Sequence, residues 1–406
     1  MSISSIRINN RVASTLQVGN VIAQSAYYGQ SLVFTTFDLA TLFNNGEQGA
    51  WYDPSDLSTL FQDDAGTTPV TEPGQTVGLM LDKRLGLTLN ANIADHAVGP
   101  LGSSSSGRGT VTPVGNGYWE CETTSIAGSN RGVFFASEQD FLEFGAVYEI
   151  EVDIQSLDAP TPGTKNIQFA VAGTQEGDQD YIADKREAII GTYKFKLRAI
   201  NEGKQTILFT TQDGWGVGDK ITIKVSVREL PGNHATQPTA ESRPVYQAGG
   251  GLHWLEFDGV DDQLRFPDGL VGEGTWSFAM AYQPDGNNFL MLHRGSSNPW
   301  VGVGEKDSTS TSISGSGASK NAFYVNNVAD TSGTRGGQYS AAQGGSRLLV
   351  DFNTSTTWSP NAKIGSYSGG SFTTPGDVYA MLLIDRSLTE DERGLVDNYL
   401  AGRVSA

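Results

Sequence analysis

The chain has 406 residues, including 50 glycines and one cysteine, and a formal net charge of −18. This length predicts two or three domains. The acidic balance argues against a nucleic-acid partner, because binding a phosphate backbone requires clustered Lys and Arg. Cys121 alone cannot form an intrachain disulfide. Without an apolar run of about 18 residues we expect no membrane insertion.

The first residues, Met1 to Arg7, lack the long apolar run of a secretory signal, so we expect synthesis in a cytoplasm. Residues 6–35 then contain three copies of a ten-residue repeat. Each copy includes a pair of residues that tolerate the positive φ of a two-residue hairpin turn. These pairs are Asn9-Asn10, Gly19-Asn20 and Gly29-Gln30.

The repeats predict a small β-meander within residues 1–45. Its strands are too short to bury a sufficient core alone. We therefore expect this segment to attach the protein to sister subunits or to another protein. An extra sheet packed on the protein's own chain is the alternative.

Residues 46–87 combine turns with short apolar segments. Trp51 and Tyr52 are expected to anchor them, and Asp53-Pro54 predicts a turn. The neighbouring Asp63 and Asp64 fit a turn better than a general acid and base.

Residues 88–230 contain a series of short alternating strands that predicts a β-sandwich. In residues 147–154, Val147 and Glu149 alternate with Tyr148 and Ile150. The strand order resembles that of jelly-roll carbohydrate-binding modules. The expected strands are 117–119, 132–135, 147–154, 167–171, 191–197, 205–209 and 220–227.

Residues 231–406 predict a second sandwich and a short C-terminal helix. The stretch 251–264 has the alternation of a hairpin, in which Trp254, Glu256 and Asp258 share one face. A capping box from Thr389 to Glu392 predicts the start of the helix.

This hairpin, together with 235–245 and 383–392, resembles the laminin-G-like, concanavalin-A-like lectin module found in bacteriophage structural proteins. In those proteins the counterpart of 81–83 runs almost directly into the counterpart of 232–236. The resemblance therefore implies one lectin-like module formed by 46–87 and 231–406, with 88–230 inserted. The fold class we expect is all-β, with two sandwich units, the N-terminal meander and the C-terminal helix.

The sequence holds few signs of catalysis or metal binding. No nucleophile elbow, phosphate loop or zinc motif is present, and the four histidines are isolated. Calcium is the one candidate cofactor, with Asp258, Asp261 and Asp262 as candidate ligands, because lectin-like sandwiches often hold this ion. Asp-Gly and Asp-Asp are also ordinary turn residues, and the sequence supplies no full ligand set.

Sugar binding requires an exposed aromatic ring beside planar polar groups. Three tryptophans lie in turn-like contexts rather than in alternating strands, and they are our candidate carbohydrate-binding residues. They are Trp215, Trp300 and Trp358. Packing in the core is the alternative for each of them and the one that the general burial of tryptophan favours.

We expect a non-enzymatic virion structural protein of a tailed phage, most closely a tail-fibre or receptor-binding protein that contacts host cell-surface polysaccharide. A capsid decoration or head-fibre protein is the alternative, and a polysaccharide depolymerase with paired carboxylates on adjacent strands is a remote one. Residues 1–45 would contact other virion proteins. The way fibres are built implies a homo-oligomer, with a trimer as the expected state.

Overall fold

The computed structural model describes residues 16–404 apart from several gaps. The gaps are 19–20, 24, 29–30, 36–37, 94–98, 101–108, 126–134, 137–141, 174–181, 201–204, 212–213, 295–296, 313, 359–361 and 366–374. The described residues form antiparallel sheets, two α-helices and short 3₁₀ helices, so the all-β prediction is confirmed.

The N-terminal repeat forms two separate antiparallel hairpins. One pairs Val18 with Val21 and the other pairs Tyr28 with Ser31. The predicted turn residues lie outside the described residues, but these registers leave two residues between the strands, as the repeat predicts. The strands are β1 (Leu16–Val18), β2 (Val21–Ala23), β3 (Ser25–Tyr28) and β4 (Ser31–Thr35).

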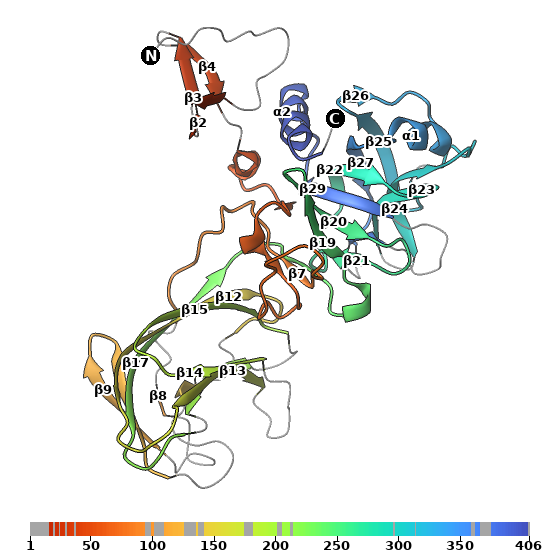
Figure 1. The fold of residues 1–406 in the computed structure, drawn as a ribbon. Helices are drawn as coiled ribbons and strands as arrows, with labels where there is room; N and C mark the ends of the chain where they lie inside the picture. The colour runs from red at the N-terminus through yellow and green to blue at the C-terminus, as the bar shows by residue number, and fades with distance from the viewer. Residues whose placement is uncertain are drawn as a thin grey trace. The chain divides into compact units, whose positions relative to one another are not determined.

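The chain divides into two compact units, which are drawn together in Figure 1. Unit 1 consists of 1–60, 70–86 and 232–406, and unit 2 consists of 61–69 and 87–231.

Unit 1 is a sandwich of a seven-stranded and an eight-stranded sheet. The first sheet has the order β24-β23-β28-β21-β18-β7-β6. The second has the order β19-β20-β29-β22-β27-β25-β26, and β5 also pairs with β29. The strands are β5 (Gly49–Tyr52), β6 (Leu60–Phe61), β7 (Leu79–Met80), β18 (Ala235–Thr236), β19 (Val245–Gly249), β20 (Leu252–Phe257), β21 (Gln263–Arg265), β22 (Gly274–Pro284), β23 (Asn288–Arg294), β24 (Ser297–Glu305), β25 (Ala318–Val325), β26 (Val328–Ala329), β27 (Ser346–Thr354), β28 (Lys363–Gly365) and β29 (Gly376–Ile384).

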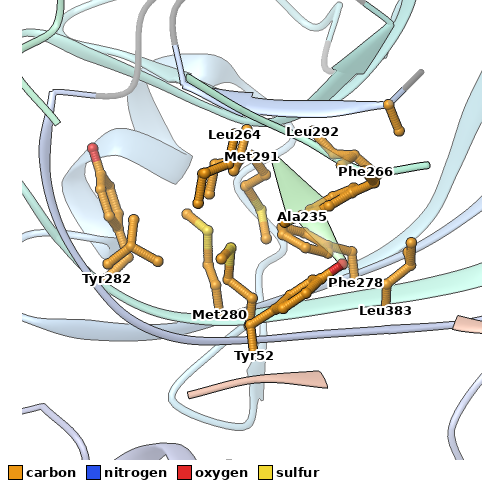
Figure 2. Packing of buried hydrophobic residues seen from close by; sticks show 14 of the residues in the cluster. Tyr52, Ala235, Leu264, Phe266, Phe278, Met280, Tyr282, Met291, Leu292 and Leu383 are labelled. Carbon is orange, nitrogen blue, oxygen red and sulfur yellow. The ribbon is translucent and has the colours of Figure 1, made fainter. Parts of the chain in front are cut away.

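The core of unit 1 is formed by the inward-facing side chains of these two sheets. Figure 2 shows Phe278 and Met280 of β22 packed near Met291 of β23 and Phe266. Tyr52 of β5 stacks on Phe266 with ring centroids 5.5 Å apart. Strand β5 thus contributes directly to the core, although it is far from residues 231–406 in sequence.

The outer face of the eight-stranded sheet is partly covered by both ends of unit 1. The helix α2 (Glu390–Ala401) and the 3₁₀ helix Leu39–Phe43 pack there around a second apolar cluster. Helix α2 starts with the predicted capping box of Thr389 and Glu392, which is confirmed. The remaining helices of the described residues are α1 (Arg335–Ala341) and the 3₁₀ helices Leu57–Thr59 and Ala240–Ser242.

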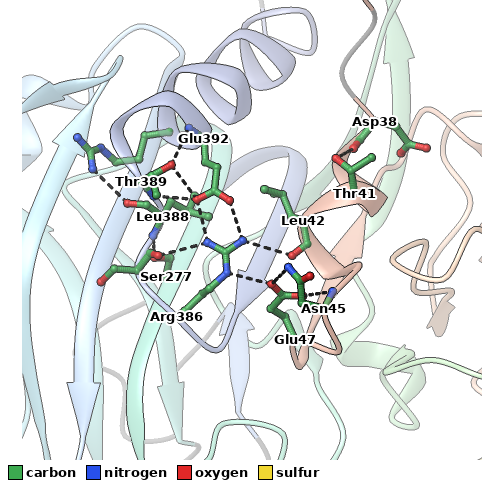
Figure 3. A network of polar contacts seen from close by, with 12 residues as sticks. Asp38, Thr41, Leu42, Asn45, Glu47, Ser277, Arg386, Leu388, Thr389 and Glu392 are labelled. Carbon is green, nitrogen blue, oxygen red and sulfur yellow. Dashed lines mark hydrogen bonds and ion pairs between the residues drawn. The ribbon is translucent and has the colours of Figure 1, made fainter.

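Arg386 connects the N-terminal 3₁₀ helix of unit 1 with helix α2, as Figure 3 shows. Its guanidinium donates two hydrogen bonds of 2.8 Å to the carboxylate of Glu392. The same group donates to Glu47 at 3.3 Å and to the carbonyl of Leu42 at 3.4 Å. One side chain therefore holds the segment after the 3₁₀ helix against the start of α2.

A buried carboxylate joins the two stretches of unit 1 on either side of residues 88–230. Asp82 is 1 % exposed, and its Oδ2 accepts a 2.8 Å hydrogen bond from the backbone N–H of Asn233. The backbone N–H of Asp82 donates to His234 Nδ1 at 3.0 Å. The chain thus leaves unit 1 and returns to it at neighbouring points.

Unit 2 is a sandwich of two five-stranded sheets, ordered β15-β12-β17-β10-β9 and β14-β13-β16-β11-β8. The alternation of residues 147–154 is confirmed, because Ile150, Val152 and Ile154 are fully buried in its core. The strands are β8 (Gly99–Pro100), β9 (Gly109–Gly115), β10 (Tyr118–Thr123), β11 (Phe135–Ala136), β12 (Val147–Asp158), β13 (Asn166–Gly173), β14 (Ile182–Glu187), β15 (Gly191–Arg198), β16 (Gln205–Thr211) and β17 (Lys220–Leu230).

Candidate functional site

Two of the three candidate tryptophans lie in the cores of the two units. Trp215 is 2 % exposed and donates from Nε1 to the carbonyl of Asn166 at 2.7 Å. Trp358 is fully buried and donates from Nε1 to Thr354 Oγ1 at 3.0 Å. Neither indole presents a face to a ligand, so the prediction that these residues bind carbohydrate is wrong. Burial removes the large apolar surface of each ring from water, and the polar N–H has a hydrogen-bond partner in the buried position.

Trp300 is partly exposed, but another side chain lies over its ring. The guanidinium carbon of Arg335 is 5.2 Å from the ring centroid, and Arg335 also pairs with Glu305 at 3.2 Å. This cation–π contact occupies the aromatic face. A sugar would have to displace Arg335 in order to stack on Trp300.

The three candidate metal ligands lie together in the turn after β20. Their carboxylate oxygens are within 4.8 Å of one another. Asp258 Oδ1 accepts from the backbone N–H of Val260 at 2.7 Å, and Asp262 Oδ2 accepts from the N–H of Asp258 at 3.0 Å. Asp261 Oδ2 accepts from Ser242 Oγ at 2.8 Å.

These contacts describe a turn held by its own side chains. Calcium takes about six to eight oxygen ligands, and this group of described residues provides three carboxylates. Burial, with added repulsion from Asp258 and Asp261, raises the pKa of Asp262 to about 7. Each of the three carboxylates already accepts a hydrogen bond inside the turn, and three ligands fall short of the calcium shell, so the trio does not form a calcium site.

A polar cleft of about 450 Å³ lies beside this turn, at the end of the eight-stranded sheet of unit 1. Ligand pockets commonly have volumes of about 300–1,000 Å³. The walls come from the end of β20, the end of β22 with the residues after it, and the start of β29. The lining residues are Glu256, Phe257, Asp258, Gln283, Pro284, Asp285, Pro375, Gly376 and Asp377.

The strand register explains why three of these side chains converge. Glu256 of β20 pairs with Asp377 of β29, which pairs with Gln283 of β22. Residues opposite one another on neighbouring antiparallel strands point to the same face. The three side chains therefore form a polar row across the outer face of the sheet.

An aromatic row lies next to the polar row on the same face. Trp254 is two residues before Glu256, and Tyr379 is two residues after Asp377, so the period of the strands keeps them on this side. Their ring centroids are 5.7 Å apart. Trp254 is partly exposed, whereas Tyr379 is 3 % exposed. The cleft thus has hydrogen-bonding groups beside a partly open indole.

The carboxylates of the cleft are electrostatically coupled. Burial, followed by repulsion from Glu256, raises the pKa of Asp377 to about 6, and Asp285 acts in the same direction. Hydrogen bonds from Tyr379 and Trp254 oppose this rise. Asp377 is therefore partly protonated in mildly acidic solution.

The sequence places Trp254 and Glu256 in a hairpin strand, with Trp254 expected to be packed, and assigns neither to a site. Gln283, Asp285 and Asp377 were missed as well. The alternation of 254–258 was the available signal. Nothing in the sequence indicates that β20 pairs with β29, which lies more than a hundred residues further along the chain.

Among the described residues, no helix has both the length and the apolar character needed to cross a membrane. No protein-family model matches the chain, and no curated protein matches it.

Solved structures overlap with the chain only loosely. The CBM22-1–CBM22-2 tandem of Paenibacillus barcinonensis Xyn10C is 12% identical, with 79% of this chain and 100% of that chain covered and a TM-score of 0.28. A CBM4 structure is 15% identical over 34% of this chain and 84% of its own, at a TM-score of 0.23. BiXyn10A CBM1 is 14% identical, with 40% of this chain and 99% of that chain covered and a TM-score of 0.24. Scores this low establish neither common descent nor a shared ligand.

Proposed function

We propose that this chain is a non-enzymatic structural protein of a phage virion, and that unit 1 binds saccharides of the host cell surface in its polar cleft. The virion assignment is supported by the lectin-module resemblance and by the N-terminal repeat. The binding assignment rests on one observation, which is the cleft with its polar row beside Trp254.

The side chains of the cleft suit sugar hydroxyls. Carboxylates and amides accept hydrogen bonds, an amide also donates them, and hydroxyls do both. The apolar face of a pyranose packs on an aromatic ring such as that of Trp254. Attachment through residues 1–45 in a homo-oligomer would repeat the cleft on one particle, and multivalency would then strengthen weak individual contacts.

Glycan binding tests this proposal directly. Wild-type protein on an array of bacterial surface polysaccharides should bind at least one, and Gln283→Ala or Trp254→Ala should weaken that binding roughly tenfold or more. Glu273→Gln is the matched control, because Glu273 precedes β22 at the end opposite the cleft. An absence of binding, or binding unchanged in both cleft variants, would refute the assignment.

Electron microscopy of labelled virions tests the place of the protein on the particle. We expect the label on the tail. A label on the head would favour capsid decoration instead, and an absence of label on intact particles would remove the virion assignment.

The proposal that the protein is not an enzyme needs its own test. Glu256 and Asp377 face each other on adjacent strands, an arrangement that a glycoside hydrolase could use. Paired carboxylates can hydrolyse glycosidic bonds. We expect no new reducing ends after incubation with a bound polysaccharide. Release that stops in Asp377→Asn would instead identify a hydrolase.

A further inference from the structure

The proposed saccharide site can be defined further by the chemical class of its ligand, an inference that rests on the proposed function. Two features of the cleft bear on this class. One is the placement of Trp254 relative to the polar row, and the other is the sign of the charges on the cleft wall.

Trp254 lies on the side of the cleft that faces the edge of the sheet. Its strand, β20, neighbours β19, which is the edge strand. A Cβ atom added to Gly249 of β19 would lie 3.5 Å from Cη2 of the indole. The ring therefore extends over a residue without a side chain, and no side chain at 249 competes for the space around it.

The distance between the two rows follows from strand geometry. Two residues along an antiparallel strand cover about 7 Å of backbone, so the backbone positions of Trp254 and Glu256 are about one saccharide unit apart. The indole N–H hydrogen-bonds Asp377 in the polar row, while Cη2 at the other end of the ring extends over Gly249. A ring that stacks on Trp254 leaves the polar row free for the next ring of the same chain.

The cleft wall carries charge of one sign. Its lining residues include four carboxylates and one amide, and none of these described residues is Lys, Arg or His. The carboxylates belong to Glu256, Asp258, Asp285 and Asp377. A carboxylate on a ligand in this cleft would lie within about 8 Å of several of them, where physiological salt does not fully screen repulsion.

We propose that the cleft takes an uncharged saccharide chain, with one ring stacked on Trp254 and the next hydrogen-bonded by Glu256, Asp377 and Gln283, and that it excludes acidic polysaccharides. Hydroxyl groups donate to the carboxylates, so a neutral ligand gains charge-assisted hydrogen bonds without like-charge repulsion. Acidic capsules and uronic-acid polymers, which carry many carboxylates, fall outside this class.

Protonation of Asp377 should weaken the exclusion of acidic polysaccharides from the cleft. Asp377 is faced by Glu256 from β20, by Asp285 from the residues after β22, and by Tyr379 and Trp254 within the sheet. Its raised pKa means that mild acid removes one negative charge from the cleft. Discrimination against acidic ligands should therefore be weaker at about pH 5 than at about pH 8.

Paired polysaccharides test the proposal. Each backbone is immobilised in two forms, one native and neutral, the other after oxidation of its primary alcohols to carboxylates. Wild-type protein should bind a neutral form and lose roughly tenfold or more in affinity for its oxidised twin. Asp285→Asn combined with Asp377→Asn should reduce that difference to about threefold, whereas Glu273→Gln should leave it unchanged.

The outcomes separate this inference from the proposed function. If neither twin binds, the saccharide-binding function itself fails. If the oxidised twin binds as well as the neutral one, the function stands and the ligand class is wrong. If Trp254→Ala binds the neutral form like the wild type while Gln283→Ala does not, the stacked ring is wrong. Trp254→Phe, which keeps an aromatic face, should retain most of the affinity, and thermal melting of every variant checks that it is folded.

Discussion

Buried carboxylates in the two units avoid the cost of isolated charge in two different ways. In unit 2, Asp219 is fully buried and pairs with Lys165 at 2.7 Å. Burial acts to raise its pKa, but hydrogen bonds from Lys165 and Thr161 outweigh this and lower the pKa to about 2. In unit 1, Asp262 has neighbours of its own sign, and its pKa rises to about 7. One carboxylate keeps its charge with a partner, and the other keeps its proton.

The raised pKa of Asp262 predicts a pH-dependent stability. The folded state binds a proton more tightly than the unfolded state, so the stabilisation is fully present below about pH 4 and is lost as the pH rises through about 7. The melting temperature of unit 1 should fall over this range, and Asp377 adds a fall in the same direction. Asp262→Asn should reduce the change of melting temperature with pH, whereas Glu273→Gln should not. If calorimetry gives the same change of melting temperature with pH for Asp262→Asn and wild type, this prediction is wrong.

The Lys165–Asp219 pair predicts a large loss of stability when it is broken. Lys165 Nζ also donates to the carbonyls of Thr161 and Gly214, at 2.7 and 2.6 Å. Lys165→Met leaves Asp219 buried without its cation, which should cost unit 2 about 3 kcal/mol in urea unfolding. The double variant Lys165→Met/Asp219→Asn should recover part of this loss. A single variant as stable as the wild type would show that solvent reaches Asp219.

Single residues also mark how far the sequence could predict the site. The turn-like contexts of Trp215 and Trp358 make them candidates for exposed rings, but both side chains lie in the cores of their units. Trp254 has the alternating context of a core strand and is partly exposed instead. Local context does not determine which face of a sheet is covered, because that depends on elements far away in the chain.

At the scale of elements, prediction succeeded where the signal was local. The alternation of β12, the two-residue spacing of the N-terminal hairpins and the capping box of α2 each depend on neighbouring residues, and each is confirmed. The cleft could not be predicted in the same way, since it requires the pairing of β20 with β29 and of β29 with β22. These pairings join strands that no short pattern connects.

The link between α2 and the 3₁₀ helix Leu39–Phe43 gives a prediction at this scale. Arg386→Leu removes the hydrogen bonds to Glu392, Glu47 and Leu42, and it should destabilise this contact by about 2 kcal/mol. Hydrogen exchange should then accelerate at the amides of Asn44 and Gly46, which close the 3₁₀ segment. Glu390→Gln, in the first turn of α2, serves as control, and unchanged protection in Arg386→Leu would show that apolar packing alone holds the segment.

At the scale of the whole molecule, we propose that residues 88–230 are an insertion into unit 1. The contacts of Asp82 with Asn233 and His234 close unit 1 at the point where the chain departs. Replacing 88–230 by a short Gly-Ser linker should therefore leave unit 1 folded, since the loop to be closed is short.

Thermal melting and glycan binding of this shortened chain provide the measurement. We expect one unfolding transition close to that of unit 1 in the full chain, and unchanged affinity for the neutral saccharide. Asp82→Ala in the shortened chain should lower the transition, because it removes the acceptor that joins the two ends. Aggregation of the shortened chain would show instead that unit 1 depends on the removed residues.

The closure at Asp82 has a consequence for inheritance as well as for folding. Asp82 and Asn233 hold together the two stretches of unit 1 on either side of 88–230. Recombination can therefore replace the coding sequence between these stretches with that of any domain whose own termini lie close together. Residues 88–230 would then be exchangeable, and the saccharide specificity that we propose for unit 1 would persist while the inserted residues change from one lineage to another.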